Sequence, residues 1–136
     1  MMGGVFPITA RRYLAEFLRS AAYGHPVYLA WGTGTGDITV YDTKLGTEVQ
    51  RAAATVTNGG TYLEITCDFT ITSATAGTAA EAGLFDASAG GIMYWRGGFH
   101  QGAPALGPNG YYRGTARTIV ATDILRITEN FSLRQT

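Results

Sequence analysis

Apolar and polar residues alternate most regularly between positions 61 and 72. One set of positions holds Leu63, Ile65, Cys67, Phe69 and Ile71, and the other holds Tyr62, Glu64, Thr66, Asp68 and Thr70. Side chains of a β-strand point to opposite faces in turn, so a period of two predicts a strand with one buried face and one solvated face. We place the first set inside.

Shorter apolar or β-branched runs predict further strands over 27–31, 38–41, 48–57, 81–85, 92–99 and 124–133. Asn58-Gly59-Gly60 separates the run over 48–57 from the alternating strand, and residues 86–91, which end in Gly90-Gly91, separate the runs over 81–85 and 92–99. Such turns are typical of hairpins, so we expect antiparallel pairing. The predicted core contains Leu63, Ile65, Phe69, Leu84, Leu125 and Ile127.

The pattern at the N-terminus is different. Tyr13, Leu14, Phe17, Leu18 and Ala21 recur at helical spacing, after a Thr9 N-cap and before a Gly24 stop, which predicts a helix over 9–24. Residues 1–8 have no period and form a flexible arm unless a neighbour fixes them, the alternative being that they fold back on their own sheet. The expected fold is mainly β, a single-domain antiparallel β-sandwich (jelly-roll-like or Ig-like) over 25–136 that follows this N-terminal α-helix.

Glycines at positions 32, 34 and 36 raise the question of a phosphate-binding loop. A dinucleotide site needs G-x-G-x-x-G between a strand and a helix, but position 37 is Asp and a β-branched run follows. No G-K-[ST] occurs in the sequence either. We therefore interpret the motif as a glycine-rich turn that lets the backbone approach closely where a strand leaves its sheet.

Charge and composition narrow the classes of partner. The formal net charge is zero and only 15% of residues are charged, which argues against nucleic acid or a membrane as a partner. No apolar run is long enough for a signal peptide or a membrane span, so we expect a soluble product. Lys44 is the single lysine, and arginine suits protein interfaces better than lysine does. This composition favours an assembly.

Residues for catalysis are few. His25 and His100 lack a third metal ligand at a suitable spacing, and Cys67, the single cysteine, is expected to be buried and inert. Four acidic residues, Asp37, Asp42, Glu81 and Asp86, could pair for glycoside hydrolysis, but acidic residues beside turns usually bond the local backbone. We expect no enzyme, no cofactor and no bound metal. A carbohydrate-binding module is the stronger competitor, with Tyr94, Trp95, Tyr111 and Tyr112 as candidate platforms.

Several segments occur in one order along the chain: WGTGTGD at 31–37, DTKLGTEV at 42–49, EAGLFDA at 81–87 with Gly90-Gly91, and ATD at 121–123. Together they resemble the capsid decoration (cement) proteins of tailed bacteriophages, with similar modules in tail and fibre proteins. The resemblance runs from about residue 28 to residue 133, and EAGLFDA is its most specific part. It implies a β-sandwich, a non-enzymatic role on the outer surface of the virion capsid, and synthesis in the host cytoplasm.

The resemblance also implies partners, namely the major capsid protein of the same phage and the chain itself as a homotrimer. We expect the assembly contacts on the N-terminal arm, the helix and the long loop over 100–114. The candidate interface residues are Val5, Phe6, Arg11, Arg12, Arg19, Tyr111, Tyr112 and Arg113. The alternatives are a tail adaptor, baseplate or fibre-base module, and a host-glycan-binding module.

Overall fold

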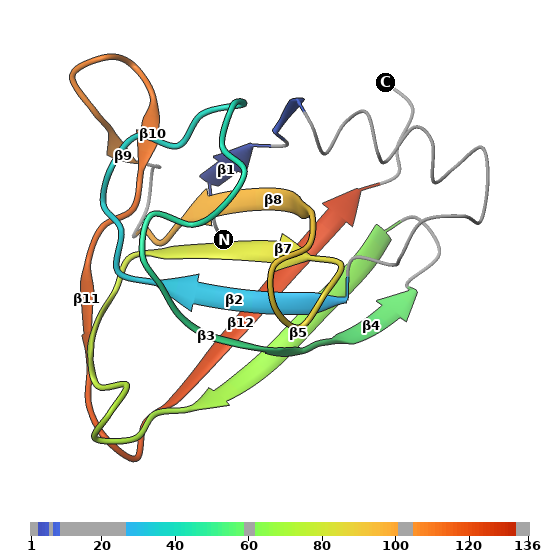
Figure 1. Ribbon diagram of the computed structural model, residues 1–136, viewed down its shortest axis with the longest axis vertical. Coiled ribbons are helices and arrows are strands. Elements are labelled where there is room, and N and C mark those ends of the chain that lie inside the picture. The colour runs from blue at the N-terminus through green and yellow to red at the C-terminus, as the bar shows by residue number, and fades with distance from the viewer. Residues whose placement is uncertain (1–2, 6, 9–26, 59–61, 101–104, 133–136) are drawn as a thin grey trace.

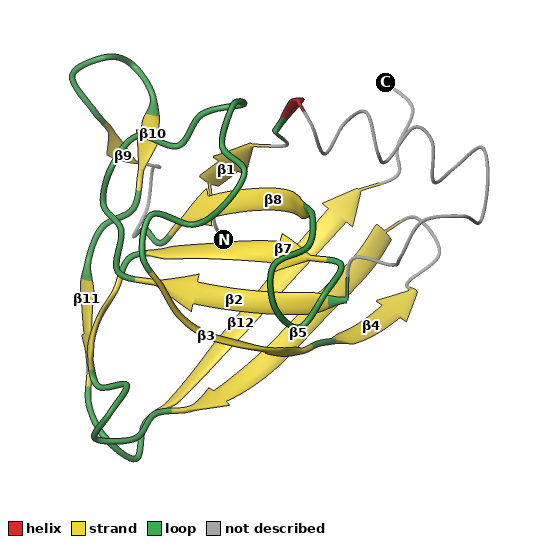
Figure 2. Ribbon diagram, in the orientation of Figure 1, coloured by secondary structure: helices red, strands yellow, loops and turns green. Residues whose placement is uncertain are grey.

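The computed structural model describes residues 3–5, 7–8, 27–58, 62–100 and 105–132 (Figure 1). These residues form short strands joined by loops, and every pairing between the strands is antiparallel (Figure 2). The strands are β1 (Gly3–Val5), β2 (Tyr28–Gly32), β3 (Glu48–Ala53), β4 (Thr55–Asn58), β5 (Tyr62–Thr70), β6 (Gly77–Ala79), β7 (Glu81–Phe85), β8 (Met93–Gly98), β9 (Ala105–Leu106), β10 (Tyr112–Arg113), β11 (Arg117–Ile119) and β12 (Ile124–Ser132). The prediction of a mainly β, antiparallel protein is confirmed.

Two sheets make up the body of the molecule. The larger has five strands in the order β1-β8-β7-β2-β3, and the smaller has three in the order β12-β5-β4. Figure 1 shows the long strands of the smaller sheet crossing behind the larger one. Only Ala54 separates β3 from β4, and its N–H donates to the carbonyl of Val27 at 2.7 Å. The chain thus passes from one sheet into the other without a loop.

The main hydrophobic core lies between the facing sides of the two sheets. Ile65, Cys67, Phe69 and Ile71 are all buried, which confirms the face assigned from the alternation. Leu29, Trp31, Leu84, Trp95 and Ile127 belong to the same cluster. Each large apolar side chain buried in this way stabilises the fold by about 1.5–3 kcal/mol. Leu125 is only partly buried against the cluster, and the side chain of Leu63 lies outside the described part of the chain.

A second, smaller cluster lies on the other face of the five-stranded sheet. It contains Ala30, Leu45, Phe85 and Met93, with Tyr28 packed against it. The loop over 33–47, which joins β2 to β3, crosses this face (Figure 1). Consequently β7 and β8 are buried along their whole length. Leu84 and Phe85 point into different clusters, as expected for neighbours in a strand.

The strand predicted over 38–41 is wrong. Ile38 makes one isolated bridge with Tyr112, and the chain then turns. The Asp42 carboxylate accepts hydrogen bonds from the Thr39 N–H at 2.8 Å and the Thr39 hydroxyl at 3.0 Å, which closes this turn. An acidic side chain that bonds a nearby backbone N–H overrides the β preference of the run. The run over 48–57 is also divided, at Ala54, into β3 and β4.

Part of the segment 1–8 is a strand. Gly3, Gly4 and Val5 pair with Gly98, Gly97 and Arg96 of β8. A Cβ on Gly4 would lie 2.5 Å from the carbonyl oxygen of Arg96, so the glycine permits this close pairing. The flexible arm is therefore a wrong prediction for residues 3–5, which fold back on their own sheet. The helix predicted over 9–24 lies outside the described residues.

Candidate functional site

The loop over 33–47 is folded around one carboxylate, that of Glu81 at the start of β7. Glu81 is fully buried on the outer face of the five-stranded sheet. Its Oε1 accepts the N–H of Gly34 at 3.0 Å and that of Thr47 at 2.8 Å, while its Oε2 accepts the N–H of Gly46 at 3.0 Å. The carboxylate thus replaces the strand partners that both ends of the loop lack.

Arg96 of β8 completes this arrangement. Its Nε and Nη2 donate to Oε2 of Glu81 at 3.0 and 2.7 Å, and its Nη1 donates to Oδ2 of Asp42 at 2.6 Å. Nη1 also reaches the carbonyl of Asp37 at 3.3 Å. Paired and fully hydrogen-bonded charges of this kind tolerate burial, whereas a single one would be very costly. We call Glu81, Arg96 and Asp42 the buried ion cluster.

This cluster explains the glycine motif. A Cβ on Gly34 would lie 2.5 Å from Oε1 of Glu81, and one on Gly32 would overlap the carbonyl of Thr47. A Cβ on Gly36 would meet no atom within 4 Å. The interpretation as a turn for close backbone approach is confirmed at Gly32 and Gly34. The anion held by this glycine-rich loop is the protein's own carboxylate.

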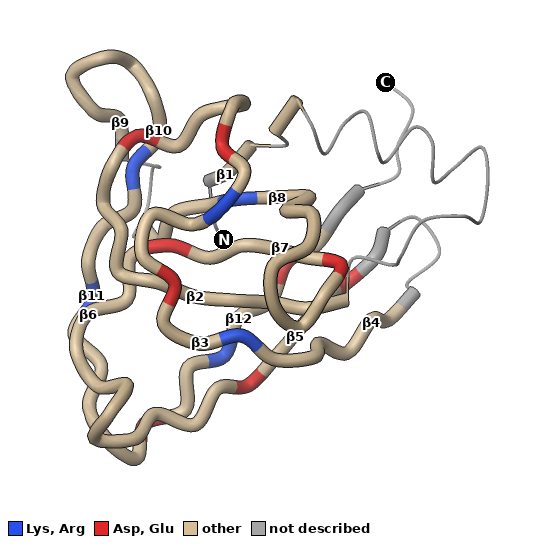
Figure 3. Tube along the Cα trace, in the orientation of Figure 1, with Lys and Arg blue, Asp and Glu red and all other residues tan. Residues whose placement is uncertain are grey.

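The four acidic residues considered for hydrolysis all bond to neighbouring groups of the chain. Glu81 and Asp42 belong to the buried ion cluster. Asp86 accepts the N–H of Ile92 at 2.7 Å and closes the β7–β8 turn. Asp37 pairs with Arg113 at 2.6 Å, and the hydrogen bond from Arg113 holds the pKa of Asp37 below its ordinary value. Figure 3 shows acidic and basic positions intermixed around the loop between β2 and β3.

The β9–β10 hairpin carries three exposed large apolar residues close together in the chain. Leu106 and Tyr112 are cross-strand partners, and 64% and 38% of their surfaces are exposed. Tyr111, beside them, is 46% exposed. Figure 1 shows the hairpin projecting from the body of the molecule. Solvated aromatic and aliphatic side chains at a projecting tip are typical of a binding surface.

Hydrogen bonds to Asp37 and Ile38 hold this hairpin to the body. The Ile38 N–H donates to the carbonyl of Tyr112 at 2.8 Å. The Arg113 Nε donates to Asp37 at 2.6 Å, and Asn109 reaches the same carboxylate at 3.4 Å. The backbone carbonyl of Asp37 also accepts a hydrogen bond from Arg96. Asp37 therefore links the hairpin to the buried ion cluster. A tip fixed in this way loses little conformational entropy on binding.

The predicted interface residues meet different outcomes. Tyr111 and Tyr112 are exposed on the hairpin, where a partner can reach them. Arg113 is bound to Asp37, and its role in an interface stays a prediction. Val5 is half-buried in β1. Phe6, Arg11, Arg12 and Arg19 lie outside the described residues, so their role stays a prediction.

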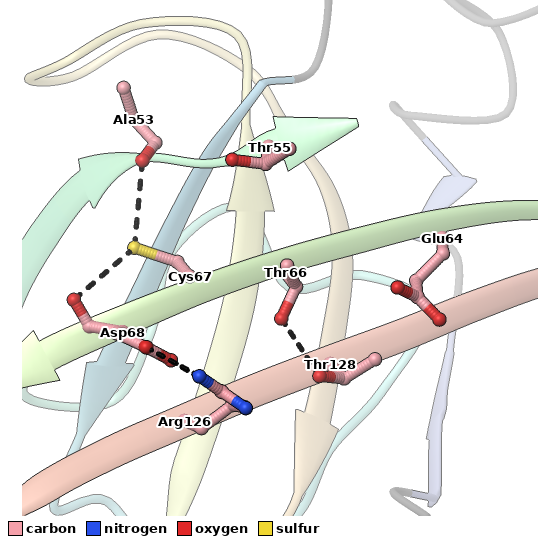
Figure 4. Close-up of a pocket in the computed structure, with 8 residues that line it drawn as sticks. All are labelled: Ala53, Thr55, Glu64, Thr66, Cys67, Asp68, Arg126 and Thr128. Atoms are coloured by element: carbon pink, nitrogen blue, oxygen red, sulfur yellow. Dashed lines mark hydrogen bonds and ion pairs between the residues drawn. The ribbon is translucent and has the colours of Figure 1, made fainter. Parts of the chain in front are cut away.

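A pocket with a volume of about 570 Å³ lies on the three-stranded sheet (Figure 4). Four of its polar side chains bond to one another in two pairs. The hydroxyls of Thr66 and Thr128 are 2.8 Å apart, and Arg126 donates two hydrogen bonds to Asp68 at 2.7 and 2.8 Å. The hydrogen bond from Arg126 lowers the pKa of Asp68. This pocket offers a solvated sheet surface without a convergent set of free groups.

Cys67 borders this pocket but points into the core. Its Sγ lies 3.5 Å from the carbonyl of Ala53, and burial raises the pKa of the thiol. A raised pKa disfavours the reactive thiolate, as expected for a buried structural cysteine. Within the described residues no three His, Cys, Asp or Glu side chains gather as metal ligands. The same part of the chain contains no helix long and apolar enough to cross a membrane.

Two expectations about aromatic residues have different outcomes. Tyr94 and Trp95 are 2% and 4% exposed and belong to the main core, so they cannot serve as a sugar platform. The register shift between Leu84 and Phe85 places both of these neighbours inside. Tyr111 and Tyr112 remain accessible.

Sequence reasoning missed the pairing of Glu81 with Arg96. The signal was present, because each of these charges stands in a run that is otherwise apolar or glycine, EAGLF and MYWRGG. A charge in a fully buried strand requires a partner of opposite sign. It also missed Glu129, whose side chain lies on the same face of β12 as Ile127 and is 9% exposed. Burial raises the pKa of Glu129 to about 7.

Comparison of the chain with protein-family models, with curated proteins and with solved structures gives no match in any of the three.

Proposed function

We propose that this protein is a non-enzymatic structural protein of a tailed-bacteriophage virion, a capsid decoration (cement) protein that binds and stabilises the outer surface of the major capsid lattice. Its partners are the major capsid protein and further copies of itself, as a homotrimer, and it needs no cofactor, nucleic acid or membrane. A trimer that bridges several capsid subunits gains avidity, because each further contact forms at high effective concentration. The two facing sheets form a β-sandwich of the jelly-roll-like or Ig-like type.

The observation that carries this proposal is the rigidly held apolar hairpin. Leu106, Tyr111 and Tyr112 are exposed at a tip that Asp37 and Ile38 tie to the body. Leucine and tyrosine in water at a fixed tip are unfavourable unless a protein partner covers them, and tyrosine is frequent at binding hot spots. The described titratable groups, in contrast, bond mostly to one another in structural pairs. A binding role therefore accounts for the surface better than a catalytic one does.

The test is the location and number of the protein in purified virions. Cryo-electron microscopy should show it on the capsid lattice in hundreds of copies. A dozen copies or fewer, at the tail, would instead support a tail adaptor, baseplate or fibre-base module. Absence from the particle would overturn the proposal altogether.

A second test uses undecorated capsids. Tyr112→Ser should reduce co-sedimentation of the protein with these capsids, because it removes an apolar contact of the assembly. Val56→Ser is the matched control, since Val56 is 44% exposed on β4, in the other sheet. Equal capsid binding by both variants would show that the hairpin has no part in assembly.

A further inference from the structure

The described surface carries a small apolar pocket (the hole) as well as the exposed apolar residues of the β9–β10 hairpin (the tip). The hole, which we call the Ile92 pocket, has a volume of about 110 Å³ and is lined by Asp42, Thr43, Gly91, Ile92 and Met93. Most of its wall is apolar, because Ile92 and Met93 form its floor at the start of β8. A cavity of about 150 Å³ accepts a benzene molecule, so this pocket matches a branched aliphatic side chain.

An exposed apolar side chain stands next in the chain to the residues that line the Ile92 pocket. Tyr41 directly precedes the lining residues Asp42 and Thr43 and is 77% exposed, more than any other large hydrophobic residue of the described chain. The turn closed by Asp42 fixes this part of the loop. An apolar hole beside a solvated tyrosine is a surface that a partner would cover.

The tip and the hole cannot satisfy each other within one chain. The Ile92 pocket lies at the first residue of β8, and the β9–β10 hairpin follows the last. The six residues of this extended strand separate the two points by roughly 17 Å. Figure 1 shows the hairpin and the β7–β8 turn at the two ends of β8.

We propose that Leu106 of one copy inserts into the Ile92 pocket of the next copy, with Tyr112 packed against Tyr41 of that copy. Because the two surfaces are different, the contact is head-to-tail, and successive contacts close a ring if the rotation between copies permits. The proposal rests on the proposed function, in which the protein acts as a homo-oligomer, and names the contact between copies. Asp37 and Arg113 orient the tip for this contact.

A mixing experiment tests the head-to-tail geometry. Leu106→Arg removes the apolar side chain of the tip, and Thr43→Arg blocks the hole. Both positions are exposed, so both variants should keep the fold. Circular dichroism can verify this. The wild-type protein should be oligomeric by analytical ultracentrifugation at high concentration, and each variant alone should be monomeric. A mixture of the two variants should form a one-to-one dimer, because one variant keeps its hole and the other its tip. Because both substitutions introduce arginine, a new ion pair between the two variants cannot account for the dimer.

The matched controls are Val56→Arg and Ser73→Arg, which place the same charge on exposed positions of β4 and of the turn after β5. Both should keep the wild-type mass. A monomeric wild type, a single variant that stays oligomeric, or a mixture without dimers would each overturn the proposal.

Cross-linking gives a readout that does not depend on the arginine variants. In a chain with Leu106→Cys and Thr43→Cys, mild oxidation should give a ladder of covalently linked copies on a denaturing gel. Each single cysteine variant, which retains the buried Cys67, should give no ladder. The absence of a ladder from the double variant would contradict the contact.

Binding to undecorated capsids, measured in parallel, separates this inference from the proposed function. If the mixture fails to dimerise but the wild type decorates capsids, the hairpin does not join copies in this way and only the inference fails. If the mixture dimerises but the wild type is absent from virions, the contact between copies stands and the proposed function fails.

Discussion

The outer faces of the two sheets are covered to very different extents. On the five-stranded sheet, the loop over 33–47 buries Glu81 and Arg96, so that β7 and β8 have no solvated residue. On the three-stranded sheet, Asp68 and Arg126 are 44% and 69% exposed, and the polar residues of β5 face water. A pair of arginine and carboxylate therefore lies in the interior on one sheet and in solvent on the other. Each of the following measurements contrasts these two environments.

The largest effect should follow Glu81→Ala. The substitution removes the fully buried carboxylate partner of Arg96, leaving only Asp42 to pair with the guanidinium, and removes the acceptor of three backbone N–H groups of the loop. Breaking one half of a buried ion pair costs about 3–5 kcal/mol. Urea denaturation should show this loss, whereas Asp68→Ala on the open face should leave the midpoint nearly unchanged. Equal losses in both variants would mean that the covering loop does not isolate the cluster from water.

The next effect concerns Glu129, a carboxyl on the inner side of the three-stranded sheet. Burial raises its pKa from an ordinary 4.5 to about 7, so between these values the folded state binds more protons than the unfolded state. Its contribution to stability is complete below about pH 4.5 and is lost as the pH rises through about 7. The loss is at most about 3 kcal/mol, at 1.36 kcal/mol for each pH unit. Denaturation at several pH values should show this slope in the wild type and not in Glu129→Gln; an identical slope in both would contradict it.

Two glycines of one motif should respond in opposite ways. A methyl group at Gly34 would collide with the Glu81 carboxylate, so Gly34→Ala should destabilise the protein by about 1–3 kcal/mol. Gly36 has open space around its Cα, so Gly36→Ala should be neutral or stabilise by roughly 0.4–1 kcal/mol, by restricting the unfolded chain. Thermal denaturation of the two variants should show a lower melting temperature for Gly34→Ala and an unchanged or higher one for Gly36→Ala. Similar shifts for both would disprove the packing of the loop around the carboxylate.

The smallest effect should follow Arg126→Ala on the open sheet. An exposed ion pair contributes little to stability and is screened by salt, so the melting temperature should barely change. The pKa of Asp68, which the hydrogen bond from Arg126 lowers, should rise to its ordinary value near 3.8. A titration followed by nuclear magnetic resonance would detect this rise. An unchanged pKa would show that the pair does not form in solution.

The contrast between the faces also explains what the sequence could predict. Ile65, Phe69 and Ile127 were correctly assigned to the core. Their sheet has one solvated face, so apolar and polar residues alternate along its strands. β7 and β8 have no such pattern, and their prediction depended on the turn that Asp86 closes. The strand predicted over 38–41 failed because a side chain from position 42 outweighs local β preference.

The candidate site was predictable only in part. Tyr111 and Tyr112 were assigned to a binding loop by residue type alone, and the structure leaves both exposed. The role of Glu81 was not predictable by local reasoning, because its partner Gly34 lies 47 positions earlier in the chain. Short strands such as β6 and β11, of three residues each, carry too few residues for any period.

The pairing of β12 with β5 sets the order in which this protein can fold. Ile124 pairs with Thr70, and Ser132 pairs with Tyr62, so each pair joins residues more than 50 positions apart. Closing such long loops costs chain entropy before any contact compensates, which makes folding slow. During synthesis, the apolar face of the β4–β5 hairpin stays partly uncovered until β12 (Ile124–Ser132) has left the ribosome and can pair with β5. We expect this waiting intermediate, rather than the finished protein, to be the species that needs protection by chaperones.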